Sequence, residues 1–178
     1  MREIIAGSEI CNSTNTYNRV QDPYSFRCAP QVHGAVYQSF MSMQNTIQTE
    51  LNSATDNPLV FPDSTDINTI LSQGNFHGEI LALGADSVSL ALFELGSISE
   101  RRMDQLLDPK KSNLPPFLAK NSGLESGLMI VQYSAGSALA ELHGHASPRS
   151  SFSTSTSAGQ EDHVSMGANG ANQLRDIV

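Results

Sequence analysis

The chain has 178 residues, of which 39% are apolar and only 16% are charged, and its formal net charge is −8. This length suits one ordinary domain. An acidic chain without a Lys/Arg cluster is a poor candidate for binding nucleic acid or an anionic membrane. The low charge content fits either a neutral polar surface or a surface covered by partner subunits.

Three features of the sequence bear on the cellular location of the protein. Its opening, Met1-Arg2-Glu3-Ile4-Ile5, has no long apolar stretch, so we expect no signal peptide. No apolar run approaches the length of a membrane span. The two cysteines, Cys11 and Cys28, have neither metal-ligand spacing nor a disulfide framework. Reduced thiols and a cytoplasmic location are therefore the expectation.

Residues 1–30 are expected to form a short helical turn and then an irregular loop, because Asn and Pro residues interrupt any periodic pattern. A helix is predicted from Gln31 to near Asp56-Asn57-Pro58, where the proline disfavours helix. Its apolar residues recur at a spacing of three to four: Val32, Val36, Phe40, Met43, Ile47 and Leu51. Within 58–75, Leu59-Val60-Phe61 and Ile70-Leu71 predict a small hairpin, with a turn at Pro62, Asp63 and Ser64.

The longest helical pattern runs from about Phe76 to Leu107. Its small residues, among them Ala82, Gly84, Ala85 and Ala91, indicate a helix enclosed on most sides, as at the centre of a bundle. Gly96 is a possible bend, and Pro109 is expected to stop the helix.

After a break at Asn113-Leu114-Pro115-Pro116, a further helix is predicted from Leu124 to His145. A Ser/Thr-rich loop at 147–160 has the composition of a linker, and 164–178 has a helical pattern. Long helices with one hairpin and no βαβ alternation predict an all-α bundle.

The sequence has five histidines. His143 and His145 are two apart and point in different directions on a helix, and His33, His77 and His163 are far apart in sequence. We therefore expect ordinary surface or core histidines and no metal site. The chain has no G-x-S-x-G, no G-x-G-x-x-G and no P-loop.

The loop at 21–27 places an amide, Gln21, a phenol, Tyr24, and a guanidinium, Arg27, close together. A guanidinium matches the two oxygens of a carboxylate, although such residues are more often packing or surface groups. Glu161 precedes a predicted helix, where an acidic residue is usually a cap or a partner of the helix dipole.

Six segments, in this order and covering nearly the whole chain, resemble the aromatic amino acid ammonia-lyase family, and most closely its histidine ammonia-lyases. They are 21–32, Asp56-Asn57-Pro58-Leu59-Val60, Gly74-Asn75-Phe76-His77-Gly78-Glu79, Ser99-Glu100-Arg101-Arg102, Leu114-Pro115-Pro116-Phe117-Leu118, and 160–167 beginning Gln160-Glu161-Asp162-His163. The resemblance implies a long-helix bundle of the ammonia-lyase (fumarase/aspartase-like) type. It makes 1–178 part of the central helical domain, with 1–30 as an active-site loop region.

The resemblance also implies roles for particular residues. Arg27 is expected to grip the substrate carboxylate, Gln21 to hydrogen-bond nearby, and Tyr24 to shape proton transfer. Phe76 is expected to wall the pocket beside the reacting carbon, and Glu161 to lie near the substrate amine. The implied reaction is loss of ammonia from histidine, giving urocanate, or from a related aromatic amino acid, in a homotetramer whose subunits share active sites.

The electrophile of this family is a methylidene-imidazolone made from an Ala-Ser-Gly tripeptide. The nearest strings here, Ser134-Ala135-Gly136 and Ser157-Ala158-Gly159, have the wrong order, and Ala146-Ser147 is followed by Pro148. The chain alone is therefore expected to be inactive. Two alternatives stay open: an aminomutase of the same family, and a non-catalytic helical fragment that binds other subunits.

Overall fold

The computed structural model describes residues 3–9, 20–62 and 69–178. Some residues named in the sequence predictions lie outside these ranges: Met1, Arg2, Cys11, Asp63 and Ser64. The described chain is mostly helical with one small two-stranded sheet, so the predicted all-α fold with one hairpin is confirmed.

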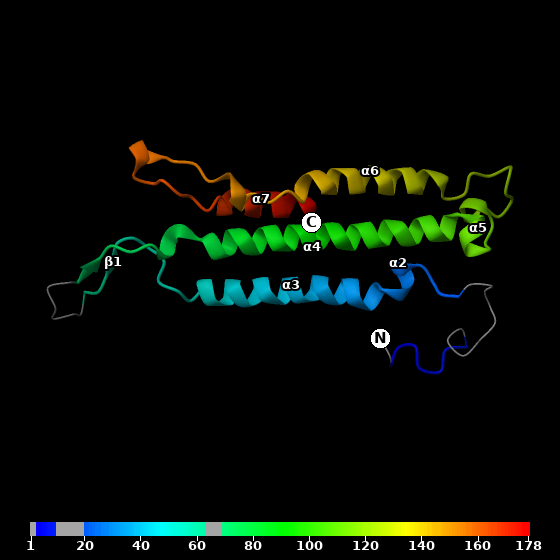
Figure 1. Cartoon of the computed structure of the whole chain (residues 1–178), viewed down its shortest axis with the longest axis horizontal. Helices are drawn as coiled ribbons and strands as arrows, with labels where there is room; N and C mark the ends of the chain where they lie inside the picture. Colours follow the sequence, from blue (N-terminus) through cyan, green and yellow to red (C-terminus); the bar gives the residue numbers. More distant parts are fainter. Residues whose placement is uncertain (1–2, 10–19, 63–68) are drawn as a thin grey trace.

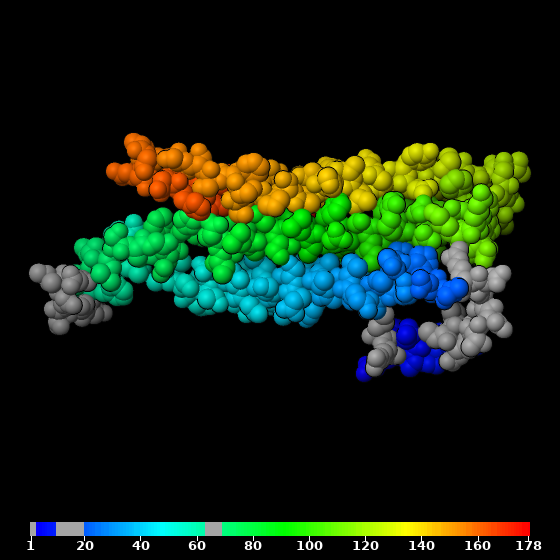
Figure 2. Space-filling view, viewed as in Figure 1, coloured from blue at the N-terminus to red at the C-terminus, as the bar shows by residue number. Residues whose placement is uncertain are grey.

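Four helices form three layers (Figure 1). The middle layer is α4 (Glu79–Leu107); α3 (Ala29–Glu50) lies on one side of it, and α6 (Met129–His145) and α7 (Gly167–Ile177) lie on the other. Figure 2 shows α4 in contact with both outer layers along its length. The long central helix therefore sets the distance between the two ends of the molecule.

Small side chains let the neighbouring helices approach α4 closely. The core follows this helix, and its buried members include Ala82, Ala85, Val88, Ser89, Ala91 and Ile98. A Cβ on Gly84 would overlap the thioether of Met43 on α3. However, Ile80, Leu83 and Leu90 are exposed. The prediction that α4 is enclosed on most sides is therefore wrong for the single chain, which covers it on two sides.

The predicted hairpin is confirmed. Strand β1 (Leu59–Val60) pairs with β2 (Ile70–Leu71) in antiparallel register, with Leu59 opposite Leu71 and Val60 opposite Ile70. The hairpin projects from the end of the bundle where α4 begins (Figure 1). It leads into η1 (Asn75–His77), a short 3-10 helix.

Helix α3 ends at Glu50, earlier than the predicted end near Asp56-Asn57-Pro58. Polar side chains at this end bond to the carbonyl groups of the last turns, since the Asn52 amide donates to Gln48 O and the Ser53 hydroxyl donates to Thr49 O. Such local bonds compete with helix continuation.

Left-handed residues explain the late starts of the later helices. Gly78, with φ 72°, separates η1 from α4, so the helix begins at Glu79 and not at Phe76. Gly127, with φ 51°, precedes α6, which begins at Met129 and not at the predicted Leu124. Met166, with φ 57°, caps α7, which begins after the predicted start at 164.

The end of α4 agrees with the prediction that Pro109 stops it. The helix ends at Leu107, and Asp108 caps the short α5 (Pro109–Ser112) by accepting a hydrogen bond from the Lys110 N–H at 2.9 Å. At Gly96 the chain continues as one unbroken α-helix. The C-terminal end of α4 and α5 therefore form one corner of the bundle, followed by η2 (Pro116–Leu118).

The Ser/Thr-rich segment at 147–160 is not a free linker. It contains η3 (Ser150–Phe152) and η4 (Ser157–Gly159). Asp86, buried in α4, accepts hydrogen bonds from the backbone N–H of Arg149 at 2.8 Å and of Ser150 at 2.9 Å. A buried carboxylate thus anchors this segment to the central helix.

The expectation that no segment reaches the length of a membrane span needs a correction. Residues Asn75–Leu107 form a stretch of 33 residues whose best window has a mean hydropathy of 1.4. By length and composition it would pass for a span. The fold gives another reason for the composition, because α4 is the central helix and packs small apolar residues against both outer layers.

Candidate active site

Tyr24 and Arg27 lie on α2 (Tyr24–Arg27), a single helical turn at the corner near α5. Pro23 starts this turn, and its carbonyl accepts hydrogen bonds from the N–H groups of Phe26 and Arg27. Residues three apart on one turn share a face. The guanidinium carbon of Arg27 accordingly lies 4.9 Å from the centre of the Tyr24 ring.

A cavity of about 440 Å³ opens beside this turn. Its lining residues are Gln21, Asp22, Pro23, Tyr24, Arg27, Gln105 and Lys111. Three of the predicted site residues therefore share one cavity. Gln105 from α4 and Lys111 from α5 complete the lining, and sequence reasoning missed both because the segment that they face is some eighty positions away in the chain.

The two cations of this cavity differ in their partners. Lys111 Nζ lies 2.6 Å from Asp104 Oδ2 and 3.6 Å from Asp108 Oδ2. The hydrogen bond that Lys111 donates to the Asp104 carboxylate raises the pKa of Lys111 above its ordinary value. Within the described part of the chain, Arg27 makes no ion pair. Its guanidinium is the group in this cavity best placed to take an external carboxylate.

The segment around η4 lies at the other end of the bundle (Figure 1), and Glu161 is an exposed residue that follows this short helix. Its Oε2 accepts hydrogen bonds from Thr156 Oγ1 at 2.8 Å and from Ser157 Oγ at 2.9 Å. These two hydroxyl donors lower the pKa of Glu161. The side chain is therefore a carboxylate at neutral pH, and such a group attracts an ammonium ion.

Phe76 lies at the same end as Glu161. It belongs to η1, the residue is 57% exposed, and it lines a cavity of about 730 Å³ between the end of α3 and the start of α4. The neighbouring His77 Nε2 is 3.1 Å from the carbonyl oxygen of His163, two residues after Glu161. This contact holds the two segments together.

The predicted residues thus form two sets that one chain does not bring together. Gln21, Tyr24 and Arg27 lie near the C-terminal end of α4, whereas Phe76 and Glu161 lie near its N-terminal end (Figure 1). Helix α4 has 29 residues, which at a rise of 1.5 Å per residue corresponds to about 43 Å. No single amino acid spans that distance.

The model of one protein family, aromatic amino acid lyase, matches residues 1–178. The chain belongs to this family. The resemblance of the six sequence segments is thereby confirmed, and the helical bundle described above is the part of the aromatic amino acid lyase fold that these residues form.

Curated relatives in the aromatic amino acid lyase family are similar over the whole chain. The histidine ammonia-lyase of Myxococcus xanthus is 49% identical over 177 residues, which is 99% of this chain and 34% of that protein. The histidine ammonia-lyase of Deinococcus radiodurans is 50% identical over 179 residues, or 100% of this chain and 34% of that protein. The chain therefore spans about a third of the length of these relatives.

Solved structures of aromatic amino acid lyases and aminomutases share the fold. Histidine ammonia-lyase from Trypanosoma cruzi matches with a TM-score of 0.82 at 48% identity, covering 88% of this chain and 30% of that one. Phenylalanine aminomutase from Pantoea agglomerans matches with a TM-score of 0.85 at 32% identity, covering 99% of this chain and 37% of that one.

Proposed function

We propose that this chain forms the carboxylate-binding part of an ammonia-lyase of the histidine type, which converts L-histidine to urocanate and ammonia. The observation that carries the proposal is the cavity at α2, where Arg27 has no ion-pair partner among the described residues and lies beside Tyr24. The identity of 49–50% to histidine ammonia-lyases supports the choice of substrate.

In this proposal each residue has a distinct task. Arg27 holds the substrate carboxylate by two parallel hydrogen bonds, and Gln21 supplies a further polar contact at the same cavity. Tyr24, whose ring lies beside the guanidinium, shapes proton transfer. Glu161 attracts the substrate ammonium group as a carboxylate, and Phe76 forms an apolar wall.

The family's electrophile, a methylidene-imidazolone, activates the substrate for loss of the amine. It does not fit the residues of this chain. The sequence contains no Ala-Ser-Gly, and the nearest reversed string, Ser134-Ala135-Gly136, is inside α6, where the Ser134 hydroxyl donates to Ile130 O. We therefore assign no step to this group here, and we propose that the chain alone is inactive.

The proposed enzyme needs more than one copy of this segment at each site. The two sets of candidate residues lie at opposite ends of α4, so a site that contains both takes Arg27 from one copy and Glu161 from another. Exposed apolar side chains on the helices, among them Ile80, Leu83 and Ile130, support burial between copies. The proposed enzyme is therefore a homo-oligomer.

Light scattering coupled to size-exclusion chromatography tests this association. The chain is expected to elute as an oligomer, because monomers would leave the apolar faces of α4 and α6 in water. A well-folded monomer over the whole accessible concentration range would contradict the proposed association.

An aminomutase is the second candidate, since aminomutases share this fold. The identity to the phenylalanine aminomutase is 32%, lower than the 49% to a histidine ammonia-lyase. A non-catalytic assembly role is the third candidate. It is supported by the absence of an Ala-Ser-Gly tripeptide from the sequence.

Product analysis separates these candidates. An intact enzyme that carries this segment is incubated with L-histidine, L-phenylalanine and L-tyrosine, and the products are identified by ultraviolet absorbance and mass. We expect an unsaturated acid and ammonia from histidine. A β-amino acid would favour the aminomutase, and no turnover of any substrate would favour the assembly role. Both of these outcomes would contradict the proposed lyase.

A further inference from the structure

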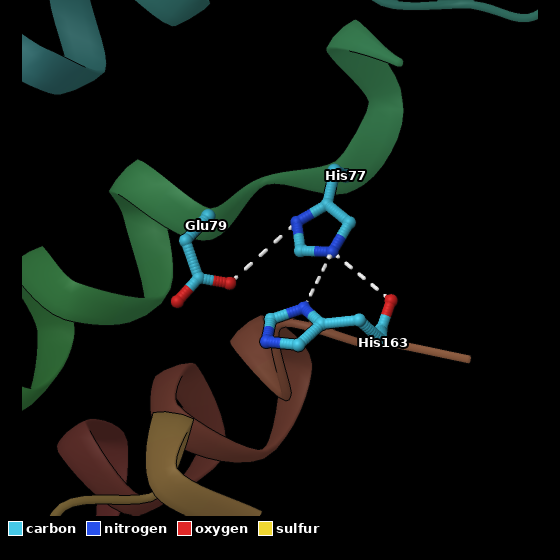
Figure 3. Close-up of side chains that lie close together, drawn as sticks. All are labelled: His77, Glu79 and His163. Atoms are coloured by element: carbon cyan, nitrogen blue, oxygen red, sulfur yellow. Dashed lines mark hydrogen bonds and ion pairs between the residues drawn. The ribbon is translucent and has the colours of Figure 1, made fainter. Parts of the chain in front are cut away.

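His77, Glu79 and His163 converge where η1, the start of α4 and the segment before α7 meet (Figure 3). One ring nitrogen of each histidine and one carboxylate oxygen lie within 4.8 Å of one another. The imidazole rings are stacked, with centroids 5.4 Å apart and an angle of 18° between their planes. The left-handed Gly78 places His77 and Glu79 on the same side of the chain.

The hydrogen bonds of His77 define which of its nitrogens has a lone pair. Its Nε2 lies 3.1 Å from the carbonyl oxygen of His163, and a carbonyl oxygen only accepts, so Nε2 carries the hydrogen. In a neutral imidazole the other nitrogen, Nδ1, then has a lone pair. This Nδ1 points at Glu79 Oε2, 3.6 Å away (Figure 3).

The carboxylate oxygen Glu79 Oε2 is buried, and no cation among the described residues is bound to it to balance its charge. This oxygen is closed off from solvent and has no hydrogen-bond donor among the described residues. A carboxylate oxygen that is buried without a partner destabilises the fold, because it has lost its contacts with water and gained no donor in exchange. Two electron-pair donors, Glu79 Oε2 and His77 Nδ1, therefore face each other without the cation that would stabilise both.

We propose that His77, Glu79 and His163 form a binding site for a divalent transition-metal ion, with Zn²⁺ as its preferred occupant. Imidazole and carboxylate ligands suit Zn²⁺, whereas Mg²⁺ and Ca²⁺ favour all-oxygen sites. Bonds of about 2.0–2.2 Å in a tetrahedral site place ligand atoms about 3.3 Å apart. The 3.6 Å between His77 Nδ1 and Glu79 Oε2 is close to this separation.

The surroundings of the cluster match those of a metal site. A histidine that binds a metal through one nitrogen usually donates its other N–H to a carbonyl or carboxylate, as His77 does to His163 O. The His163 ring stacks on the His77 ring, and its Nδ1 lies 3.3 Å from His77 Nε2. Because His163 is exposed, a change of its side-chain rotamer would exchange this contact for a bond to the ion. Two histidines and one carboxylate leave the fourth position to water.

Titration calorimetry of the full chain with Zn²⁺, after treatment with a chelator, tests the proposal. We expect one Zn²⁺ per chain. The substitutions His77→Ala, Glu79→Gln and His163→Ala should each weaken binding by more than about 100-fold, since even outer-shell partners contribute about 10–100-fold. Glu79→Gln keeps the shape of the side chain, and His163→Ala changes an exposed one, so circular dichroism should show unchanged helix content.

His143→Gln is the matched control, because His143 is also exposed but lies on α6 outside the cluster. It should bind Zn²⁺ as the unsubstituted chain does. With Co²⁺ in place of Zn²⁺, a visible absorption band typical of four-coordinate cobalt should appear, and it should be absent in Glu79→Gln. The proposal is overturned if the chain binds no Zn²⁺, if the three substitutions leave binding unchanged, or if His143→Gln abolishes it.

Discussion

The guanidinium of Arg27 lies over the ring of Tyr24, 4.9 Å from its centre, at the edge of a cavity that also includes Gln21. A cation over an aromatic face contributes about 0.5–1 kcal/mol at an exposed site, which favours this orientation of the guanidinium over others. Arg27 and Tyr24, on the same helical turn, thus contact each other and line the same cavity.

Replacing Arg27 tests carboxylate recognition in an intact enzyme that carries this segment. Arg27→Ala should reduce kcat/KM for histidine by the equivalent of about 2–5 kcal/mol, as for a desolvated charge that loses its partner. Arg27→Lys should reduce kcat/KM less, because lysine keeps the positive charge and loses only the planar pair of N–H donors that matches a carboxylate. Steady-state kinetics measures both. Lys120→Ala, at an exposed position, is the control, and unchanged kinetics in both Arg27 variants would remove Arg27 from the site.

The isolated chain should show no ammonia-lyase activity. General base catalysis contributes about 10²–10⁴-fold, far too little to remove the weakly acidic β-proton of an amino acid without an electrophile. Binding of a carboxylate by Arg27 without transition-state stabilisation gives no turnover. Ultraviolet absorbance of the unsaturated acid is the measurement, with histidine, tyrosine and phenylalanine as substrates. Turnover above the level of a contaminant would contradict the account of the missing electrophile.

Asp86 should stabilise the fold by anchoring the Ser/Thr-rich segment to α4. Asp86→Ala leaves the N–H groups of Arg149 and Ser150 without their acceptor. The free energy of unfolding should fall by about 1.5–3 kcal/mol, the usual contribution of hydrogen bonds to a charged group. Urea denaturation followed by circular dichroism measures this change. Glu94→Ala, on the exposed side of the same helix, should change stability far less, and equal effects would refute the anchoring role.

Sequence periodicity predicted the bundle because each long helix carries a repeating apolar face, and the hairpin because its short apolar runs are separated by turn residues. The helix boundaries were harder to predict, because residues with a left-handed backbone conformation, such as Gly127 and Met166, determine where the helices begin. The cavity at α2 was predictable because Gln21, Tyr24 and Arg27 lie within one short loop.

Other features depend on long-range contacts that a single sequence does not reveal. His77 and His163 are 86 positions apart, and only the fold brings their rings together. Asp86 had no local signal for its role, because its partners come from a segment with the composition of a linker. The sequence alone likewise could not show that the candidate residues lie at opposite ends of the bundle, because this follows from the position of α4 in the fold.

We propose that a working site combines Arg27 of one copy with Glu161 of another. In an intact enzyme carrying this segment, Arg27→Ala and Glu161→Gln should each be nearly inactive alone, since every site then lacks one of the two groups. Oligomers assembled from both variants contain some sites with an intact Arg27 from one copy and an intact Glu161 from the other.

The most direct measurement is the ammonia-lyase activity of the two variants after they are mixed, unfolded and refolded together. With equal amounts and random assembly, about a quarter of the sites should have both groups intact, so activity should rise to about that fraction of the unsubstituted enzyme. Each variant refolded alone is the control. If both groups acted from the same chain, every site would keep one defect, and a mixture no more active than the separate variants would contradict the shared site.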